Sequence, residues 1–227
     1  MSGPVAGPVR PSLSEIDALC RLAARGAGYP WGLAEEAGRA ARDLWKGGAD
    51  GPGAVLAVLR ALDGDDPAEH APVPSPGPWR AAAGGGAWLC PIAAGAALSD
   101  RAHRFAAGEA VTLERLVAPV LLVPVLARAR SALPGGFGIE PVPPDAAAPD
   151  APVPLVRVCF GPSGAETSAG NGVDGEGRSA AAAAAVPGSR RVAEPGTWGA
   201  LEAFAHRTRV PASEASRRGA GGAGEDG

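Results

Sequence analysis

The sequence has few aromatic residues, a single lysine and little excess charge of either sign. Aromatic side chains make up 4% of the 227 residues, and the sequence has one lysine, Lys46, compared with twenty arginines. We read this arginine bias as compositional rather than as an anion-binding surface. The formal net charge of −3 and the pI near 5.7 lack the basic footprint of proteins that bind nucleic acid or anionic membranes. We therefore expect neither partner.

Long apolar runs and paired cysteines are also absent. The longest apolar run, 116–127, contains two prolines and falls short of the roughly 20 residues that a membrane helix needs. The first residues have neither the basic start nor the apolar segment of a signal peptide. Cys20, Cys90 and Cys159 are far apart and lack C-x-x-C spacing, which favours a reducing compartment over a disulfide framework. The sequence predicts a cytoplasmic protein.

Glycine and proline, by contrast, are abundant and clustered. Together they form about a quarter of the chain, close to the level at which aperiodic sequence is disordered. Their clusters divide the chain into segments of different predicted order. These are a flexible arm (1–11), a helical layer (12–63), a Pro-rich linker (64–78), an α/β core (79–160), a low-complexity disordered segment (161–190), the C-terminal helix of the core (191–210) and a flexible tail (211–227).

The N-terminal part has the clearest helical patterns. Ser12 and Glu15 form a capping box before a helix that ends at Arg25. A second helix over 30–46 has an apolar stripe in which small residues allow another backbone to approach closely. This stripe consists of Trp31, Ala34, Gly38, Ala41 and Trp45. A third short helix over 53–62 completes a predicted antiparallel layer.

The remainder mixes strand and helix signals. We predict strands on either side of Gly84–Gly86, over 79–83 and 87–94, and better-defined strands over 137–142 and 155–160. Residues 113–133 read as a kinked helix capped by Thr112, with a buried strand as the alternative. The end of the chain adds a short strand over 190–193 and a helix over 194–207. The predicted fold is α+β: an N-terminal three-helix layer packed on a small mixed or antiparallel sheet, with long disordered linkers.

No motif identifies a catalytic centre, so we predict no catalytic residue, metal ligand or cofactor. The G-x-G-x-x-G pattern at 219–224 lacks the strand and helix that dinucleotide binding requires. The histidines are not spaced as metal ligands, and 99–103 favours a polar turn over a catalytic group. The Ser–Arg cluster at 213–218 has two readings, a mobile clamp over an anionic ligand or a disordered tail.

Two functional readings remain. The first is a non-catalytic interaction or accessory protein, which binds a protein partner or forms a homo-oligomer. The second is a small-molecule-binding domain or enzyme with a pocket between the N-terminal helices and the sheet, which a concave site with convergent polar groups would favour. The candidate ligand-binding residues are Trp31, Glu35, Arg39, Asp100 and Arg101. No ligand class follows from them, and a solvated helix face is the competing reading for Glu35.

Four stretches, 13–16, 23–40, 89–100 and 210–217, resemble a family of uncharacterised bacterial proteins of the domain-of-unknown-function kind. The resemblance implies a cytoplasmic bacterial protein and brings no activity, cofactor or catalytic residue. The chain departs from the family pattern at Arg209 and in its tail after 219.

Overall fold

In the computed structural model, residues 9–84, 86–133, 136–142, 155–161 and 192–208 are described. The α-helices are α1 (Leu13–Gly26), α2 (Trp31–Lys46), α3 (Gly51–Ala61), α4 (Pro91–Asp100), α5 (Leu122–Arg128) and α6 (Pro195–His206). Short 3₁₀ helices are η1 (Ala102–Arg104), η2 (Pro119–Leu121) and η3 (Arg130–Ala132). The strands are β1 (Pro72–Val73), β2 (Arg80–Ala81), β3 (Ala110–Glu114), β4 (Phe137–Val142) and β5 (Leu155–Phe160). The predicted α+β class is confirmed.

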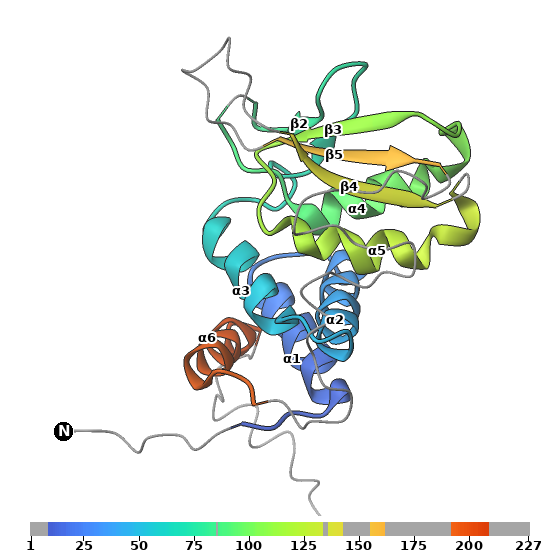
Figure 1. Cartoon of the computed structure of the whole chain (residues 1–227). Helices are drawn as coiled ribbons and strands as arrows, with labels where there is room; N and C mark the ends of the chain where they lie inside the picture. Colours follow the sequence, from blue (N-terminus) through green and yellow to red (C-terminus); the bar gives the residue numbers. More distant parts are fainter. Residues whose placement is uncertain (1–8, 85, 134–135, 143–154, 162–191, 209–227) are drawn as a thin grey trace, which may run out of the picture.

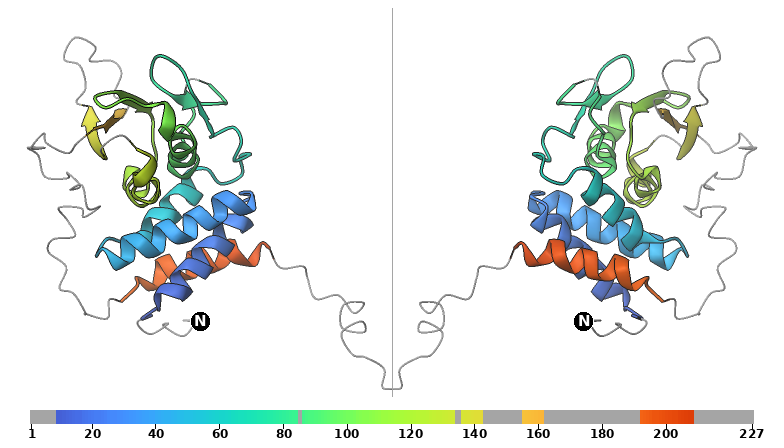
Figure 2. Two further views of the ribbon diagram at one scale, coloured as in Figure 1. Left: turned by 90° about the vertical axis from the view of Figure 1, so that its right-hand side faces the viewer. Right: turned by 90° about the vertical axis from the view of Figure 1, so that its left-hand side faces the viewer.

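These elements form layers (Figure 1 and Figure 2). The antiparallel sheet, in the order β3–β5–β4, is one outer layer, and α4 and α5 lie against it. The other outer layer consists of α1, α2, α3 and α6. Since α4 is in the middle, it contributes to two cores: Ile92 packs with the helical layer, and Leu98 packs with the sheet.

The helical layer begins as the sequence predicts. The Ser12 hydroxyl accepts from the Glu15 amide at 3.2 Å, and the Glu15 carboxylate accepts from the Ser12 amide at 2.7 Å. This capping box satisfies two amides that would otherwise lack partners. The third helix begins at Gly51, earlier than predicted, because the Asp50 carboxylate caps it by accepting from the Gly53 amide at 3.0 Å.

Small residues let the helices of this layer approach closely. A Cβ atom on Gly38 would lie 2.6 Å from the Asp17 carbonyl oxygen of α1, and Ala34 and Ala41 are fully buried. The predicted stripe is wrong at one end, because Trp31 is 58% exposed. Side chains of a helix tilt toward its N-terminus, so that of the first residue projects past the end of the helix. Trp45 packs at the margin of the core.

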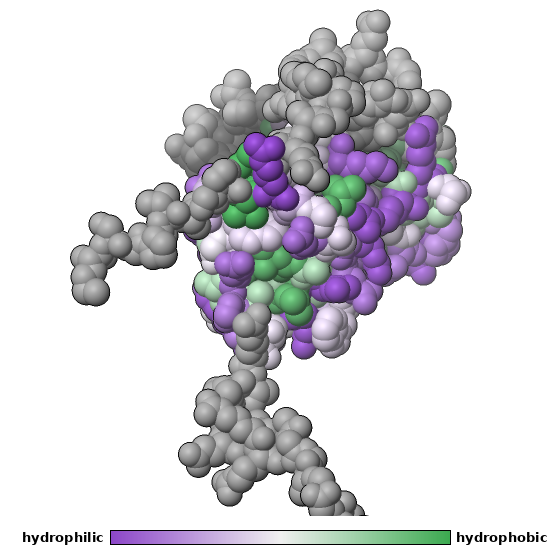
Figure 3. Space-filling view, turned by 90° about the horizontal axis from the view of Figure 1, so that it is seen from below, coloured by the Kyte–Doolittle hydropathy of each residue, from purple (hydrophilic) through white to green (hydrophobic). Residues whose placement is uncertain are grey.

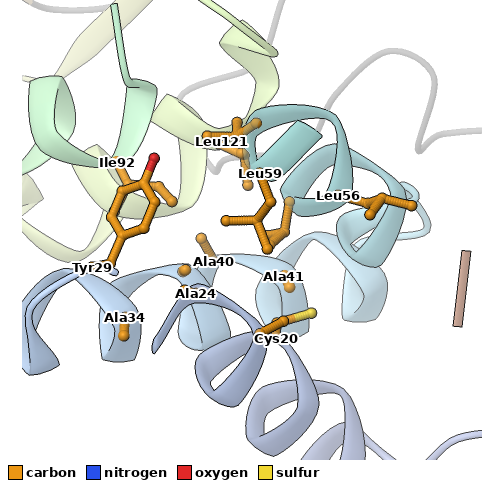
Figure 4. Close-up of a cluster of buried hydrophobic side chains, with 14 of the residues drawn as sticks. Cys20, Ala24, Tyr29, Ala34, Ala40, Ala41, Leu56, Leu59, Ile92 and Leu121 are labelled. Atoms are coloured by element: carbon orange, nitrogen blue, oxygen red, sulfur yellow. The ribbon is translucent and has the colours of Figure 1, made fainter. Parts of the chain in front are cut away.

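Aromatic and aliphatic side chains from the middle layer close this core. Figure 4 shows Tyr29 rising from the α1–α2 connection, with Ile92 and Leu121 on the same side of the cluster. The Tyr29 hydroxyl donates to Cys90 Sγ at 3.6 Å. Leu59 of α3 fills the space beside them. The core therefore joins the helical layer to α4 and η2.

The C-terminal helix joins this layer too. Glu194 caps α6, and its carboxylate accepts from the Thr197 amide at 2.6 Å. The sequence pattern groups this helix with residues 79–160, whereas its main contacts are with α1 and α3. Just before α6, Ala193 forms an antiparallel bridge with Val9.

The predicted pairing around Gly84 is wrong. Strand β2 pairs with β1, and no strand follows at 87–94. Residues from Pro91 onward instead form α4, because proline at the first helical position needs no amide partner and has a suitable φ. Cys90 is the N-cap residue. Leu89 retains only an isolated parallel bridge to Leu116.

Residues 113–133 are neither wholly helix nor wholly strand. Thr112 lies within β3 and caps no helix, because its stretch pairs with β5 in the register Leu113↔Val156. The strand alternative is therefore right for the first residues. The helix prediction is right for α5, which follows the 3₁₀ turn that begins at Pro119. Within the described ranges, no helix has both the length and the apolar character that crossing a membrane requires.

The sheet supplies the second core. The predictions of strands at 137–142 and 155–160 are confirmed, and these strands pair in the register Ile139↔Val158. Val158 and Phe160 point inward against α4 and α5, and Phe160 stacks on Phe105 with ring centroids 4.2 Å apart. The alternation of β5 thus follows the burial of one sheet face.

The predicted linker 64–78 has local structure. It contains turns and β1, and the His70 ring is buried. His70 Nδ1 lies 2.8 Å from the Trp88 carbonyl oxygen, and Nε2 lies 3.1 Å from an Asp65 carboxylate oxygen. The predictions for 162–190, for 213–218 and for 219–224 fall outside the described residues. The division into segments stays a prediction.

Candidate functional site

A groove of about 570 Å³ lies between α2 on one side and α4 and α5 on the other. We call it the interlayer groove, because it is between the helical layer and the middle layer. Its lining residues are Pro30, Gly32, Leu33, Glu35, Glu36, Arg39, Ala96, Ser99, Asp100, Val125, Arg128 and Ala129. A groove of this size is in the range of small-molecule sites.

The groove combines an apolar part with charged walls. Leu33, Ala96 and Val125 supply its apolar surface, one from each of the surrounding helices. Helices α4 and α5 meet closely there, since a Cβ atom on Gly95 would lie 2.8 Å from Val125 Cγ1. The glycine therefore determines how near the α5 wall is to α4.

Ion pairs occupy both guanidinium groups of the lining. Arg39 donates to Glu35 at 2.7 Å and to Glu36 at 2.8 Å. Arg128 of α5 pairs with Glu36 and, at 2.9 Å, with Asp43. Each guanidinium is thus held by two carboxylates, and the Arg128 pairs join α5 to α2 across the groove. Partly exposed pairs of this kind contribute little stability singly and more as a network.

Asp100 differs from the other charged lining residues in its lack of an ion pair within the described part of the chain. It is the last residue of α4 and is exposed. Its carboxylate has no hydrogen bond or ion pair with any residue that the structure describes. The neighbouring Ser99 hydroxyl donates to the Gly95 carbonyl oxygen at 2.8 Å, so its lone pairs remain available as hydrogen-bond acceptors. Asp100 and Ser99 therefore contribute acceptor atoms to the lining of the groove.

Three of the five candidate residues from the sequence line this groove: Glu35, Arg39 and Asp100. The other two do not. The Arg25 guanidinium lies over the Trp31 ring, with Arg25 Cζ 4.9 Å from the ring centroid. Arg101 is not part of the groove lining. Its guanidinium donates to the Ala97 carbonyl oxygen at 3.3 Å and lies over the ring of Trp79.

Sequence reasoning missed Arg128. This residue is at the end of α5, inside the stretch whose helical or extended state the sequence left open. The face of a residue follows only once the period of its element is known. The four apolar residues at 120–123 and Pro124 hide that period, so nothing in the local pattern directs Arg128 toward α2.

The cysteine thiols lie outside the groove. Burial raises the pKa of Cys20 and of Cys90, and it also raises the pKa of Cys159 on the sheet. A protonated thiol is a poor nucleophile. None of the three lines the groove, and its described lining contains neither histidine nor lysine. The groups that are present can bind a ligand through apolar contact, hydrogen bonds and ion pairing.

A second depression, of about 460 Å³, lies on the sheet side of the molecule. It is lined by Pro74, Ser75, Pro76, Trp79, Phe105, Glu109, Ala110 and Val111. Its one carboxylate is already engaged, because Glu109 accepts from the Ala106 amide at 2.9 Å. The interlayer groove is the site of these two with a carboxylate left unpaired.

Comparison with known protein families finds a match for part of the chain. Residues 11–87 match the family described as Protein of unknown function (DUF3726). This match spans about a third of the chain and includes α1, α2 and α3. Glu35 and Arg39 lie inside the matched residues, whereas Asp100 and the α5 wall lie beyond them. No curated protein and no solved structure matches the chain.

Proposed function

We propose that the protein is a non-catalytic binding protein and that the interlayer groove is its ligand site. The observation that carries this proposal is the convergence of Glu35, Arg39 and Asp100 on one concave surface. A concave site with convergent polar groups favours a small ligand over a flat partner surface. The proposal therefore follows the second interpretation of the sequence, a small-molecule-binding domain, and keeps from the first only its non-catalytic character.

The groups around the groove support binding rather than catalysis. The Ser99 hydroxyl donates to a backbone carbonyl, not to a base that would activate it. Arg39 and Arg128 are each neutralised by two carboxylates, so neither is free to stabilise a developing negative charge. Recognition through shape and fixed charge is the chemistry that remains.

A fragment titration of the full chain tests this function. Small amphiphilic fragments of either charge and of none are added to the ¹⁵N-labelled protein, and amide shifts are followed at Gly32, Ala96 and Ala129. The variant Ala96→Phe places a ring in the groove, and Ala203→Phe on the exposed face of α6 is its control. We expect fragment shifts that Ala96→Phe abolishes and Ala203→Phe preserves. If no fragment shifts these amides, the groove is not a ligand site.

A second function, binding of a protein partner, has one observation in its favour. Trp31 is 58% exposed next to the groove-lining Pro30 and Gly32, and tryptophan is over-represented among residues that dominate protein interfaces. Elsewhere, the face made by the helical layer shows hydrophobic residues scattered among hydrophilic ones (Figure 3). The variant Trp31→Ala should weaken association with a partner. Self-association, measured by sedimentation at several concentrations, is the first case to test.

We also propose a reducing, cytoplasmic location. All three cysteines are free, and Cys20 and Cys90 are fully buried, as is usual for small apolar residues in reducing compartments. Thiol titration of protein extracted under acid quench would find three reduced cysteines. An oxidised fraction that persists would contradict the location.

A further inference from the structure

We propose that the interlayer groove selects a cationic small molecule, with an ammonium or guanidinium group at Asp100 and a short apolar stem along Leu33 and Val125. This inference rests on the proposed function and specifies its ligand class. It follows from the state of each charged side chain around the groove and from the position of the apolar surface beside them.

The first step is the balance of charge. Glu35, Glu36 and Asp100 oppose Arg39 and Arg128, so the lining has a formal charge of −1. The excess is localised, because both arginines and both glutamates take part in ion pairs. Asp100 alone among the five has no partner in the described part of the chain. A cation can therefore bind there without breaking an existing pair.

The second step excludes the opposite ligand charge. An anion would need a free guanidinium, yet Arg39 is held at 2.7 and 2.8 Å and Arg128 by Glu36 and Asp43. Displacing two carboxylates from one arginine removes two charge-assisted hydrogen bonds, the stronger kind. The anion would also approach the unpaired Asp100 carboxylate. Binding an anion is disfavoured on both counts.

The third step gives the rest of the ligand. The Ser99 hydroxyl adjoins Asp100 and still has acceptor lone pairs, which suits the several N–H donors of an ammonium or guanidinium group. Leu33, Ala96 and Val125 offer apolar surface from three helices. A stem of a few methylene groups would cover this surface while its charged head reaches the end of α4.

The test uses n-butylammonium and n-butylguanidinium as cations, with n-butanol and butyrate as neutral and anionic probes with stems of similar length. Each is titrated into the full chain while the amide shifts of Ala96 and Val111 are followed. Val111 reports on the second depression. We expect the cations to shift Ala96 and to bind more tightly than the other probes.

The variant Asp100→Asn should weaken cation binding by up to about fivefold, the range expected for loss of an ion pair to a solvent-exposed carboxylate. Glu69→Gln is the matched control, because it removes a negative charge from an exposed residue outside the groove. It should leave the affinity unchanged. Added salt should weaken cation binding in the parent and not in Asp100→Asn.

The outcomes separate the two proposals. The cationic ligand class is wrong if the probes shift the Ala96 amide regardless of their charge. It is also wrong if the cations bind Asp100→Asn as tightly as they bind the parent. In both cases the groove is still a binding site. Cations that shift Val111 instead of Ala96 also overturn this inference. If neither charged nor neutral probes affect Ala96, and the fragment titration fails as well, the proposed function itself is wrong.

Discussion

Replacing Gly38 by alanine tests the close packing of α1 on α2. The added Cβ would lie 2.6 Å from the Asp17 carbonyl oxygen and 3.2 Å from Arg21 Cβ. A Cβ does not tolerate a separation of 2.6 Å, and the nearest obstacle is backbone, which cannot turn away as a flexible side chain would. The two helices must therefore move apart, and the packing of Cys20 and Ala41 behind them must loosen.

Two opposing effects set the magnitude. Overpacking a core costs roughly 1–3 kcal/mol, whereas alanine in place of glycine inside a helix contributes about 1 kcal/mol of stability. Gly199 of α6 isolates the second effect, because it is exposed and a Cβ atom added to it would have no neighbour within 4 Å. The difference between Gly38→Ala and Gly199→Ala therefore measures overpacking alone.

Urea unfolding followed by circular dichroism is the assay. Gly199→Ala should raise the free energy of unfolding by about 0.5–1 kcal/mol. Gly38→Ala should fall below it by about 1–3 kcal/mol. Equal stabilisation by the two substitutions would refute the close approach of α1 and α2.

Other predictions concern buried and titrating groups. The buried His70 ring bonds to the Trp88 carbonyl oxygen and to Asp65. His70→Leu removes both hydrogen bonds, so it should lower the free energy of unfolding by about 1–3 kcal/mol. The exposed His103→Leu should not lower it, and an equal loss in both variants would contradict the buried role of His70. Burial raises the pKa of the Cys20 thiol in the folded state, so stability should be complete below pH about 8.5 and fall above it by up to about 1.4 kcal/mol per pH unit. Cys20→Ala should flatten that fall in urea titrations between pH 8 and 10. The ion pair with Arg207 lowers the pKa of Asp63, so its contribution is present above pH about 4 and lost as the pH falls through the folded value. Asp63→Asn should therefore lower the free energy of unfolding by less than about 1 kcal/mol at pH 6 and by less still at pH 2, and a loss of equal size at the two pH values would contradict this.

The helices of the first layer could be predicted because their signals are local. The Ser12 capping box, the small residues around Gly38 and the alternation in 155–160 each act within one turn or one strand. The same locality explains the error at Trp31. Periodicity assigns a residue to a face, but it does not show that the side chain of the first residue projects past the end of its helix.

The misassigned segments depend on distant partners. Thr112 reads as a helix cap until β5, more than forty residues away, pairs with its strand. Pro91 lies within a predicted strand but begins a helix, because its neighbours 92–98 are apolar on all sides and fit between two cores. The groove shares this dependence. Glu35, Arg39 and Asp100 could be named from the sequence, whereas Arg128 joins them only through the packing of α5 on α2.

The most direct test of the account is where a bound cation lies. Intermolecular nuclear Overhauser effects between n-butylammonium and the methyl-labelled full chain report the position of the alkyl stem. The account predicts contacts from the terminal methyl to the methyl groups of Leu33 and Val125, which weaken in Asp100→Asn. Contacts to Val111 at the second depression, or no contact with Leu33 and Val125 at saturating ligand, would contradict it.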